Sequence, residues 1–100
     1  MDAASIDRFR KFVETIASGP GTLAAKVRTA AAGAGPVDGV AGPVVDKIRK
    51  HAYKVVDEDI AALRAAGLSE DQIFELAVAA AAGTALRQLE AGLAAARGGA

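Results

Sequence analysis

Hydrophobic residues recur along this chain at the spacing of α-helices. In the first such segment, Ile6, Phe9, Val13 and Ile16 return every three or four positions with charged residues between them, and Phe12 lies beside them. This spacing places the apolar side chains on one face of a helix. We therefore predict an amphipathic first helix, which the glycine and proline residues at positions 19–21 bring to an end.

The next two segments are predicted to be a short helix and a loop. Thr22 is a residue type that favours an N-cap, so a second helix is expected from Thr22 to about Ala32. The stretch 33–43, GAGPVDGVAGP, holds four glycines and two prolines, which disfavour regular structure. It lacks the spacing of a phosphate-binding loop, so we interpret it as a flexible connector.

Two further helices are predicted between this loop and residue 67. The third begins near Pro43, and one of its faces is apolar: Val44 or Val45, Ile48, Ala52 and Val55. The fourth is predicted to have Asp57 as its N-cap, with Glu58 and Asp59 in its first turn, and to end at Gly67.

The last helix is predicted to be the longest, from Glu70 to about Arg97. Ser69 and Gln72 have the spacing of a capping box, in which each side chain bonds the other residue's backbone amide. Its centre, AVAAAAGTA at positions 77–85, carries no charge on any side. We therefore expect this segment to be buried on all sides, partly against another subunit, and predict a homo-oligomer.

The composition agrees with a single all-α domain of about five helices over residues 1–100. Alanine, the best helix former, fills 26 positions, whereas aromatic residues fill four. Twelve basic residues balance twelve acidic ones, so no strong overall field favours nucleic acid or an anionic membrane, and neither is predicted as a partner. The absence of cysteine excludes disulfides, thiolate metal sites and a cysteine nucleophile.

The sequence also bears on the compartment. The first twelve residues, MDAASIDRFRKF, include acidic side chains and no continuous apolar core, unlike a signal peptide. The longest uncharged run in the second half, 76–86, is far shorter than the roughly 20 residues that a membrane-spanning helix needs. We therefore expect a soluble cytoplasmic protein.

Residues 52–83 resemble the alkylhydroperoxidase D-like and carboxymuconolactone decarboxylase superfamily. The family signature is C-x-x-C-x-x-x-H followed by an alanine-rich turn that ends in A-G-L-[ST]-x-[DE]-x-I, and residues 65–81 read AAGLSEDQIFELAVAAA. The resemblance implies an all-α domain that assembles into dimers, trimers or hexamers. It also implies one of two activities, which are peroxide reduction by the cysteine pair or decarboxylation of a lactone without it.

The catalytic part of that signature is missing. Counting back from Gly67, the histidine position falls on Asp59 and the cysteine positions fall on Val55 and Ala52. The family's upstream glutamate would fall near Val40, where no glutamate occurs. Thiol peroxidase activity is therefore not expected.

The remaining candidates for chemistry lie between residues 51 and 59. Asp59 or His51 would serve as a general base, with Tyr53 or Lys54 as acid or oxyanion partner, in proton abstraction or decarboxylation beside a carbonyl. The alternative is that these residues are structural. Asp59 would then form an ion pair with Lys54, Arg64 or another subunit, and Tyr53 would pack with its hydroxyl satisfied.

No metal site or cofactor is predicted, because the adjacent acidic residues 57–59 face different directions on a helix. The basic residues Lys47, Lys50, His51 and Lys54 share a helical spacing, which we interpret as a solvated stripe.

Two function classes thus compete. If the chain is a small-molecule-binding protein or a non-redox enzyme, we expect a pocket lined by Tyr53, Lys54 and Asp59, and an altered pKa for at least one of these residues. A non-catalytic structural protein instead predicts that these residues are tied up in ion pairs and caps, while the scaffold serves homo-oligomer assembly.

Overall fold

The computed structural model describes residues 2–98, and every regular element in that range is a helix. The helices are α1 (Ala3–Ser18), α2 (Ala25–Ala32), α3 (Ala41–His51), the short 3₁₀ helix η1 (Ala52–Lys54), α4 (Asp57–Ala65) and α5 (Glu70–Ala96). The predicted all-α class with five helices is therefore confirmed.

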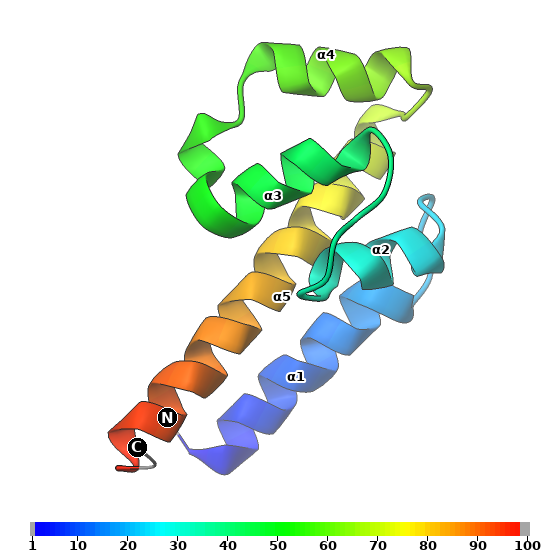
Figure 1. Cartoon of the computed structure of the whole chain (residues 1–100). Helices are drawn as coiled ribbons and strands as arrows, with labels where there is room; N and C mark the ends of the chain where they lie inside the picture. The colour runs from blue at the N-terminus through cyan, green and yellow to red at the C-terminus, as the bar shows by residue number, and fades with distance from the viewer. Residues whose placement is uncertain (1, 99–100) are drawn as a thin grey trace.

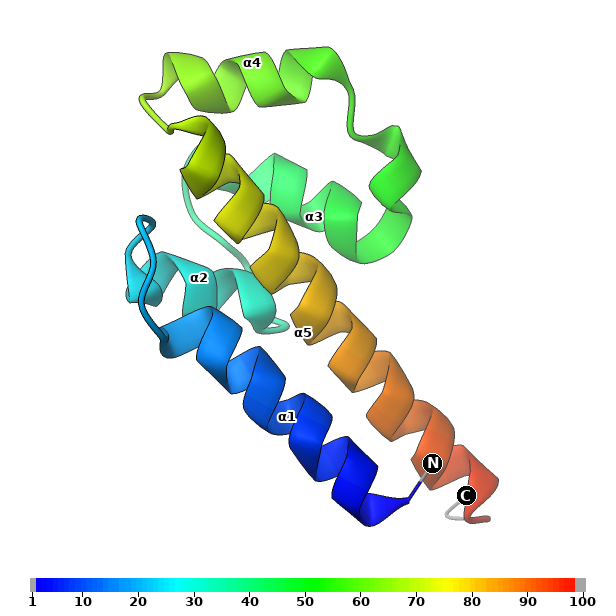
Figure 2. The same cartoon turned by 180° about the vertical axis from the view of Figure 1, so that it is seen from behind.

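The helices form an elongated body of 47 × 28 × 19 Å that is organised around α5. Helix α1 runs antiparallel to α5 and lies beside it, with the start of α1 and the end of α5 at the same end of the molecule (Figures 1 and 2). Helix α2 packs against both of them, and α3 and α4 gather at the N-terminal half of α5. Helix α5 thus contacts each of the other four α-helices.

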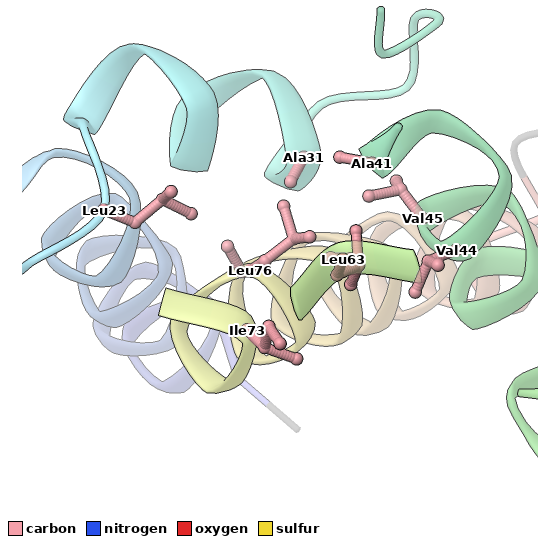
Figure 3. Close-up of a cluster of buried hydrophobic side chains, with 10 residues drawn as sticks. Leu23, Ala31, Ala41, Val44, Val45, Leu63, Ile73 and Leu76 are labelled. Atoms are coloured by element: carbon pink, nitrogen blue, oxygen red, sulfur yellow. The ribbon is translucent and has the colours of Figure 1, made fainter. Parts of the chain in front are cut away.

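Small side chains make up much of the core. The buried cluster comprises Leu23, Ala31, Ala41, Val44, Val45, Leu63, Ile73, Leu76, Ala79 and Ala80, and Figure 3 shows eight of them labelled where α2, α3, α4 and α5 meet. Four of these residues are alanines, which lets the helix backbones approach closely. One such close approach lies at Gly83, where an added Cβ would contact the carbonyl group of Ala32 in α2.

The predicted junction between α4 and α5 is confirmed in detail. Gly67 has a φ of 101°, which favours glycine, and its amide bonds the Arg64 carbonyl while the Leu68 amide bonds the Leu63 carbonyl. Ser69 Oγ then accepts from the Gln72 amide at 3.1 Å, and Gln72 Oε1 accepts from the Ser69 amide at 2.9 Å. Both signals are local to the chain, so the sequence pattern alone identified them.

The predicted start of the second helix is wrong. Helix α2 begins at Ala25 after Ala24, which forms no side-chain cap. Thr22, predicted to be the N-cap, instead donates from its amide and hydroxyl to the carboxylate of Glu75 in α5. A charged acceptor contributed by another helix binds these donors, and Thr22 therefore lies in the connecting segment.

The third helix also differs from its prediction at both ends. It begins at Ala41, so the loop is shorter than 33–43, and Pro43 lies inside the first turn, where its missing amide costs nothing. The helix ends at His51, whose backbone leaves the helical conformation at φ −151° and ψ 73°, and the chain continues as η1. Ala52, predicted to lie on the buried face, is consequently exposed.

The uncharged centre of α5 is not buried on all sides within one chain. Ala79, Ala80 and Gly83 are buried against α2 and α3, whereas Ala81 and Ala85 are exposed. Only one side of α5 is covered by the other helices, so the opposite side keeps its apolar surface in contact with solvent. Among residues 2–98, no helix combines the length and the apolar character that crossing a membrane requires.

Candidate functional site

Asp59 lies in the first turn of α4 and connects it to α3. Its carboxylate accepts from Lys47 Nζ at 2.8 and 3.0 Å and from the Val56 amide at 2.9 Å. Val56 is therefore the N-cap residue of α4, and the prediction that Asp57 occupies this place is wrong. The cap is supplied by Asp59 because its carboxylate reaches back to an amide that has no partner within the helix. The ion-pair partner is Lys47 rather than the predicted Lys54 or Arg64.

These contacts hold Asp59 in its ionised form. The hydrogen bond from Lys47 and then the bond from the Val56 amide lower the pKa of Asp59 below its ordinary value of 3.8, although partial burial acts in the opposite direction. A carboxylate with a lowered pKa is a weak base and supplies no proton near neutral pH. The contacts of Asp59 are therefore those of a structural link between α3 and α4.

The other three predicted site residues lie on the surface of the connection between α3 and α4. His51, Tyr53 and Lys54 are all exposed, and the Tyr53 side chain is 80% exposed. The rings of His51 and Tyr53 meet edge to face with their centroids 5.7 Å apart. The structure thus separates an ion-paired Asp59 from an exposed segment of His51, Tyr53 and Lys54.

The predicted basic stripe is divided in the same region. Lys47 is directed to Asp59, and Lys54 belongs to η1, beyond the break at His51. In the part of the chain that the structure describes, no three acidic, histidine or cysteine side chains converge in a way that would hold a metal ion.

The sequence reasoning missed a groove of about 310 Å³ between α1 and α5. Its walls are the C-terminal turn of α1, the connecting segment that follows it, and the N-terminal half of α5. The lining residues are Thr15, Ile16, Pro20, Gly21, Arg28, Phe74, Glu75 and Val78. Phe74 forms one lip of the groove and is 69% exposed, which is unusual for a side chain of this size.

Arg28 forms part of the floor of this groove and is only 4% exposed. Its Nη1, Nη2 and Nε atoms donate to the carbonyls of Ile16, Gly19 and Leu23 at 2.7, 2.5 and 2.9 Å. The guanidinium therefore binds the C-terminal end of α1, where carbonyl groups lack helical partners. It also fixes the segment that leads into α2.

Glu75 completes the floor. Its carboxylate accepts from the amides of Thr22 and Leu23 at 2.9 and 3.3 Å and from the Thr22 hydroxyl, and it lies 3.8 Å from Arg28 Nε. The bond from the Thr22 hydroxyl is the main cause that lowers the pKa of Glu75, so the carboxylate is ionised at neutral pH. Gly21 lies directly over the pair, because a Cβ there would contact Glu75 Oε1 and lie 3.1 Å from Arg28 Cζ.

No local signal in the sequence indicated this pair. Arg28 lies in AKVRTAAA, where one basic residue on a short helix is typical of a solvent-facing position. The carbonyls that it binds come from Ile16 in α1 and from Gly19 and Leu23 in the connecting segment, and Glu75 comes from α5. The pair therefore becomes recognisable only when the three helices are assembled.

An apolar face runs away from the groove along α1 and α5. On α1, Phe9, Phe12 and Ile16 lie at helical spacing, and the rings of Phe9 and Phe12 stack. On α5 a second row of residues at helical spacing, from Phe74 to Leu89, contains no charged side chain. The row on α1 reaches the groove at Ile16, and the row on α5 reaches it at Val78. We call this surface the apolar face, which comprises Phe9, Phe12, Ile16, Phe74, Val78, Ala82, Ala85 and Leu89.

Comparison with known proteins gave no relative for this chain. No protein-family model matches it, and neither the curated proteins nor the solved structures contain a match. The resemblance stated for residues 52–83 stays a prediction, and the geometry described above carries the argument about function.

The ion pair of Asp59 predicts a specific pH dependence of stability. Because the pKa of Asp59 is lower in the folded protein than in the unfolded chain, its ionised form stabilises the fold at pH values above 3.8. Asp59→Asn is therefore expected to unfold at a lower urea concentration than the wild type at neutral pH. As the pH falls below 3.8 and through the lowered pKa, the wild type loses this contribution and the two proteins become equally stable.

Urea unfolding of both proteins at a series of pH values checks this expectation. Asp57→Asn is the matched control, because Asp57 is an exposed carboxylate in the same helical turn and is expected to have a smaller effect at neutral pH. A difference between wild type and Asp59→Asn that stays constant down to the acid limit contradicts the assignment of Asp59 as a structural ion pair.

Proposed function

We propose that this chain is a cysteine-free protein of the alkylhydroperoxidase D-like kind whose helical scaffold assembles with a second copy of itself through the apolar face. The observation that carries the proposal is the exposure of this face. Phe12 on α1 and Phe74 on α5 are 56% and 69% exposed. Ala82 and Ala85, which belong to the same face on α5, are small and uncharged. Exposed apolar surface of this continuity is typical of an interaction site.

The shape of the face favours a second copy as the partner. Bulky side chains such as Phe12 and Phe74 stand beside a shallow row at Ala82 and Ala85, so the surface offers both ridges and space for ridges. In a two-fold dimer each copy presents the same patch, and the bulky part of one meets the small part of the other. With no net charge on the chain, like-charge repulsion between copies is small.

The arrangement around Asp59 supports a structural function as well. Acid–base chemistry, the other function class predicted from the sequence, needs a carboxylate that exchanges protons under working conditions. Asp59 is bound by Lys47 and by the Val56 amide, and its pKa is lowered. The residues predicted to act with it, Tyr53 and Lys54, are exposed.

Sedimentation velocity over a roughly hundredfold range of protein concentration tests the proposal, because a self-associating chain shifts towards the larger species by mass action. The wild type is expected to sediment as a dimer or larger oligomer at the upper end of the range. Ala85→Glu introduces a charge in the middle of the apolar face and is expected to sediment as a monomer throughout. Ala85 is exposed in the single chain, so the variant keeps its fold.

Ala91→Glu is the matched control. Ala91 is also exposed on α5 but lies about 120° around the helix from Ala85, at 100° per residue, so it is outside the apolar face. It is expected to associate like the wild type. A wild type that stays monomeric at every concentration overturns the proposal, and an Ala85→Glu variant that associates like the wild type assigns the interface to another surface.

A further inference from the structure

We propose that Arg49 of α3 and Arg87 of α5 form a binding site for the phosphate group of a small ligand at the C-terminal end of α2. Neither arginine belongs to the apolar face or lines the groove beneath Phe74, so the site goes beyond the proposed self-assembly. Both residues are partly exposed, which leaves them within reach of a ligand in solution.

The last carbonyls of α2 bring the two guanidinium groups together. Arg49 Nη2 donates to the Ala31 carbonyl at 3.1 Å, and Arg87 Nη1 donates to the Ala32 carbonyl at 2.6 Å. The two acceptors are consecutive, so both side chains reach the same helix end from opposite neighbours of α2. Burial and then the positive charge of Arg49 lower the pKa of Arg87 below its ordinary value, which agrees with two like charges held close together.

The positive charge of this pair is not balanced by the chain. Among residues 2–98, no salt bridge joins either arginine to a carboxylate. The acidic residues three positions away in the sequence, Asp46 and Glu90, pair with Lys50 and Arg10 instead. The carbonyl end of a helix carries only about half a negative elementary charge, so most of the charge on two guanidinium groups remains. A bound anion supplies the negative charge that the site lacks.

The pair also keeps hydrogen-bond donors for a ligand. Arg49 makes two more bonds, to the carbonyls of Ala30 and Gly35 at 3.0 and 2.6 Å, and Arg87 Nη2 donates to Thr84 Oγ1 at 3.3 Å. Since a guanidinium carries five N–H groups, these bonds leave donors on both side chains. In addition, Arg49 Nε is buried and bonds no acceptor in the part of the chain that the structure describes. An unpartnered donor on a buried charged group is costly, so the chain alone does not complete the bonding of this pair.

A phosphate group matches these features better than a carboxylate does. Guanidinium groups bind oxyanions through pairs of parallel N–H···O bonds. A phosphate ester offers three acceptor oxygens and nearly two negative charges at neutral pH, so it can face two guanidinium groups at once. A carboxylate brings one charge and two oxygens, and would balance only one of the two arginines.

Inorganic phosphate is the probe that tests this inference, titrated at constant ionic strength into the full-length wild type and followed by ¹H–¹⁵N correlation NMR. Saturable shifts are expected for the side-chain Nε–H signals of Arg49 and Arg87. No such shift is expected for Arg10, whose guanidinium is already paired with Asp7 and Glu90. Acetate at the same ionic strength is expected to bind at least about tenfold more weakly.

Two glutamine variants complete the design. Arg87→Gln removes one of the two charges and is expected to weaken phosphate binding by at least about tenfold. Arg64→Gln is the matched control, because it removes an exposed arginine of α4 that pairs with Glu70, and it is expected to leave the affinity unchanged. Arg87→Lys keeps the charge but lacks the planar donors, so it is expected to bind more weakly than the wild type and more tightly than Arg87→Gln.

The inference is overturned if the Arg49 and Arg87 signals do not saturate, if acetate binds as tightly as phosphate, or if Arg87→Gln binds phosphate as tightly as Arg64→Gln. Because Arg87 also bonds the Ala32 carbonyl, circular dichroism checks the fold of its variants. If Arg87→Gln does not fold, an Arg87→Lys variant that binds phosphate like the wild type overturns the inference as well. These outcomes are independent of whether sedimentation finds an oligomer.

Discussion

Gly83→Ala is expected to lower the free energy of unfolding by about 2 kcal/mol or more, which is the size of effect seen when atoms are forced into a packed core. The added Cβ would contact the Ala32 carbonyl oxygen and lie 2.6 and 2.7 Å from the carbon and Cα of the same residue. These atoms belong to the backbone of α2, so no side-chain rotation relieves the clash. Helix propensity alone favours alanine by about 1 kcal/mol, which only reduces the loss.

Helices α2 and α5 must therefore separate to admit the methyl group. The Ala32 carbonyl also accepts from Arg87 Nη1 at 2.6 Å, so a shift of α2 disturbs that bond as well. Denaturant unfolding followed by circular dichroism measures the effect. Gly92→Ala is the matched control in the same helix, because nothing lies within 4 Å of the added Cβ, and it is expected to stabilise the chain by about 0.5–1 kcal/mol.

We therefore expect opposite changes in the free energy of unfolding, a decrease for Gly83→Ala and an increase for Gly92→Ala. If Gly83→Ala is as stable as the wild type or more stable, the close crossing of α2 and α5 is not a rigid feature of the fold.

Arg28→Met is expected to cost about 3 kcal/mol or more, the range observed when one partner of a buried charged network is removed. Methionine keeps much of the volume but leaves the carbonyls of Ile16, Gly19 and Leu23 without their guanidinium donors. Glu75 loses the positive charge that it faces in its salt bridge with Arg28. Each buried acceptor without a partner adds its own desolvation cost.

The matched control is Arg10→Met. Arg10 also bridges two carboxylates, at Asp7 and Glu90, but its side chain is 39% exposed, and exposed pairs contribute little to stability. Its midpoint of urea unfolding is expected to stay close to that of the wild type. Arg28→Lys is informative too, because an ammonium keeps the charge but lacks the planar set of donors that reaches three carbonyls. Arg28 has no structural function of this kind if Arg28→Met unfolds at the same midpoint as Arg10→Met.

The helices themselves were largely predictable from the sequence. The apolar spacing from Ile6 to Ile16 identified α1, and Gly67 with Ser69 and Gln72 located the boundary between α4 and α5. These signals act within one turn of chain, so they need no information about distant residues. Alanine content and the absence of charge in the centre of α5 indicated close helix packing, which the structure confirms at Ala79, Ala80 and Gly83.

The errors arose where a distant partner decided the local structure. Thr22 has the side chain of an N-cap, but its donors bind Glu75 from α5. Asp57 is also a residue type that favours an N-cap, but the carboxylate that caps α4 belongs to Asp59, which forms an ion pair with Lys47 from α3. A charged group from another helix competes with the local cap, and its position is not encoded in the neighbouring residues.

The sequence by itself determined the helical class, the order of the helices and most of their ends, because helix periodicity and capping are properties of short stretches. It also identified Asp59 as a residue for which a charged partner had to be found. Only the tertiary structure decided which partner that is. It also decided that Arg28 is buried, that a groove lies beneath Phe74, and that one side of α1 and α5 stays uncovered. These features depend on side chains brought together from helices far apart in the chain, and their energies come from burial and charge in the assembled fold.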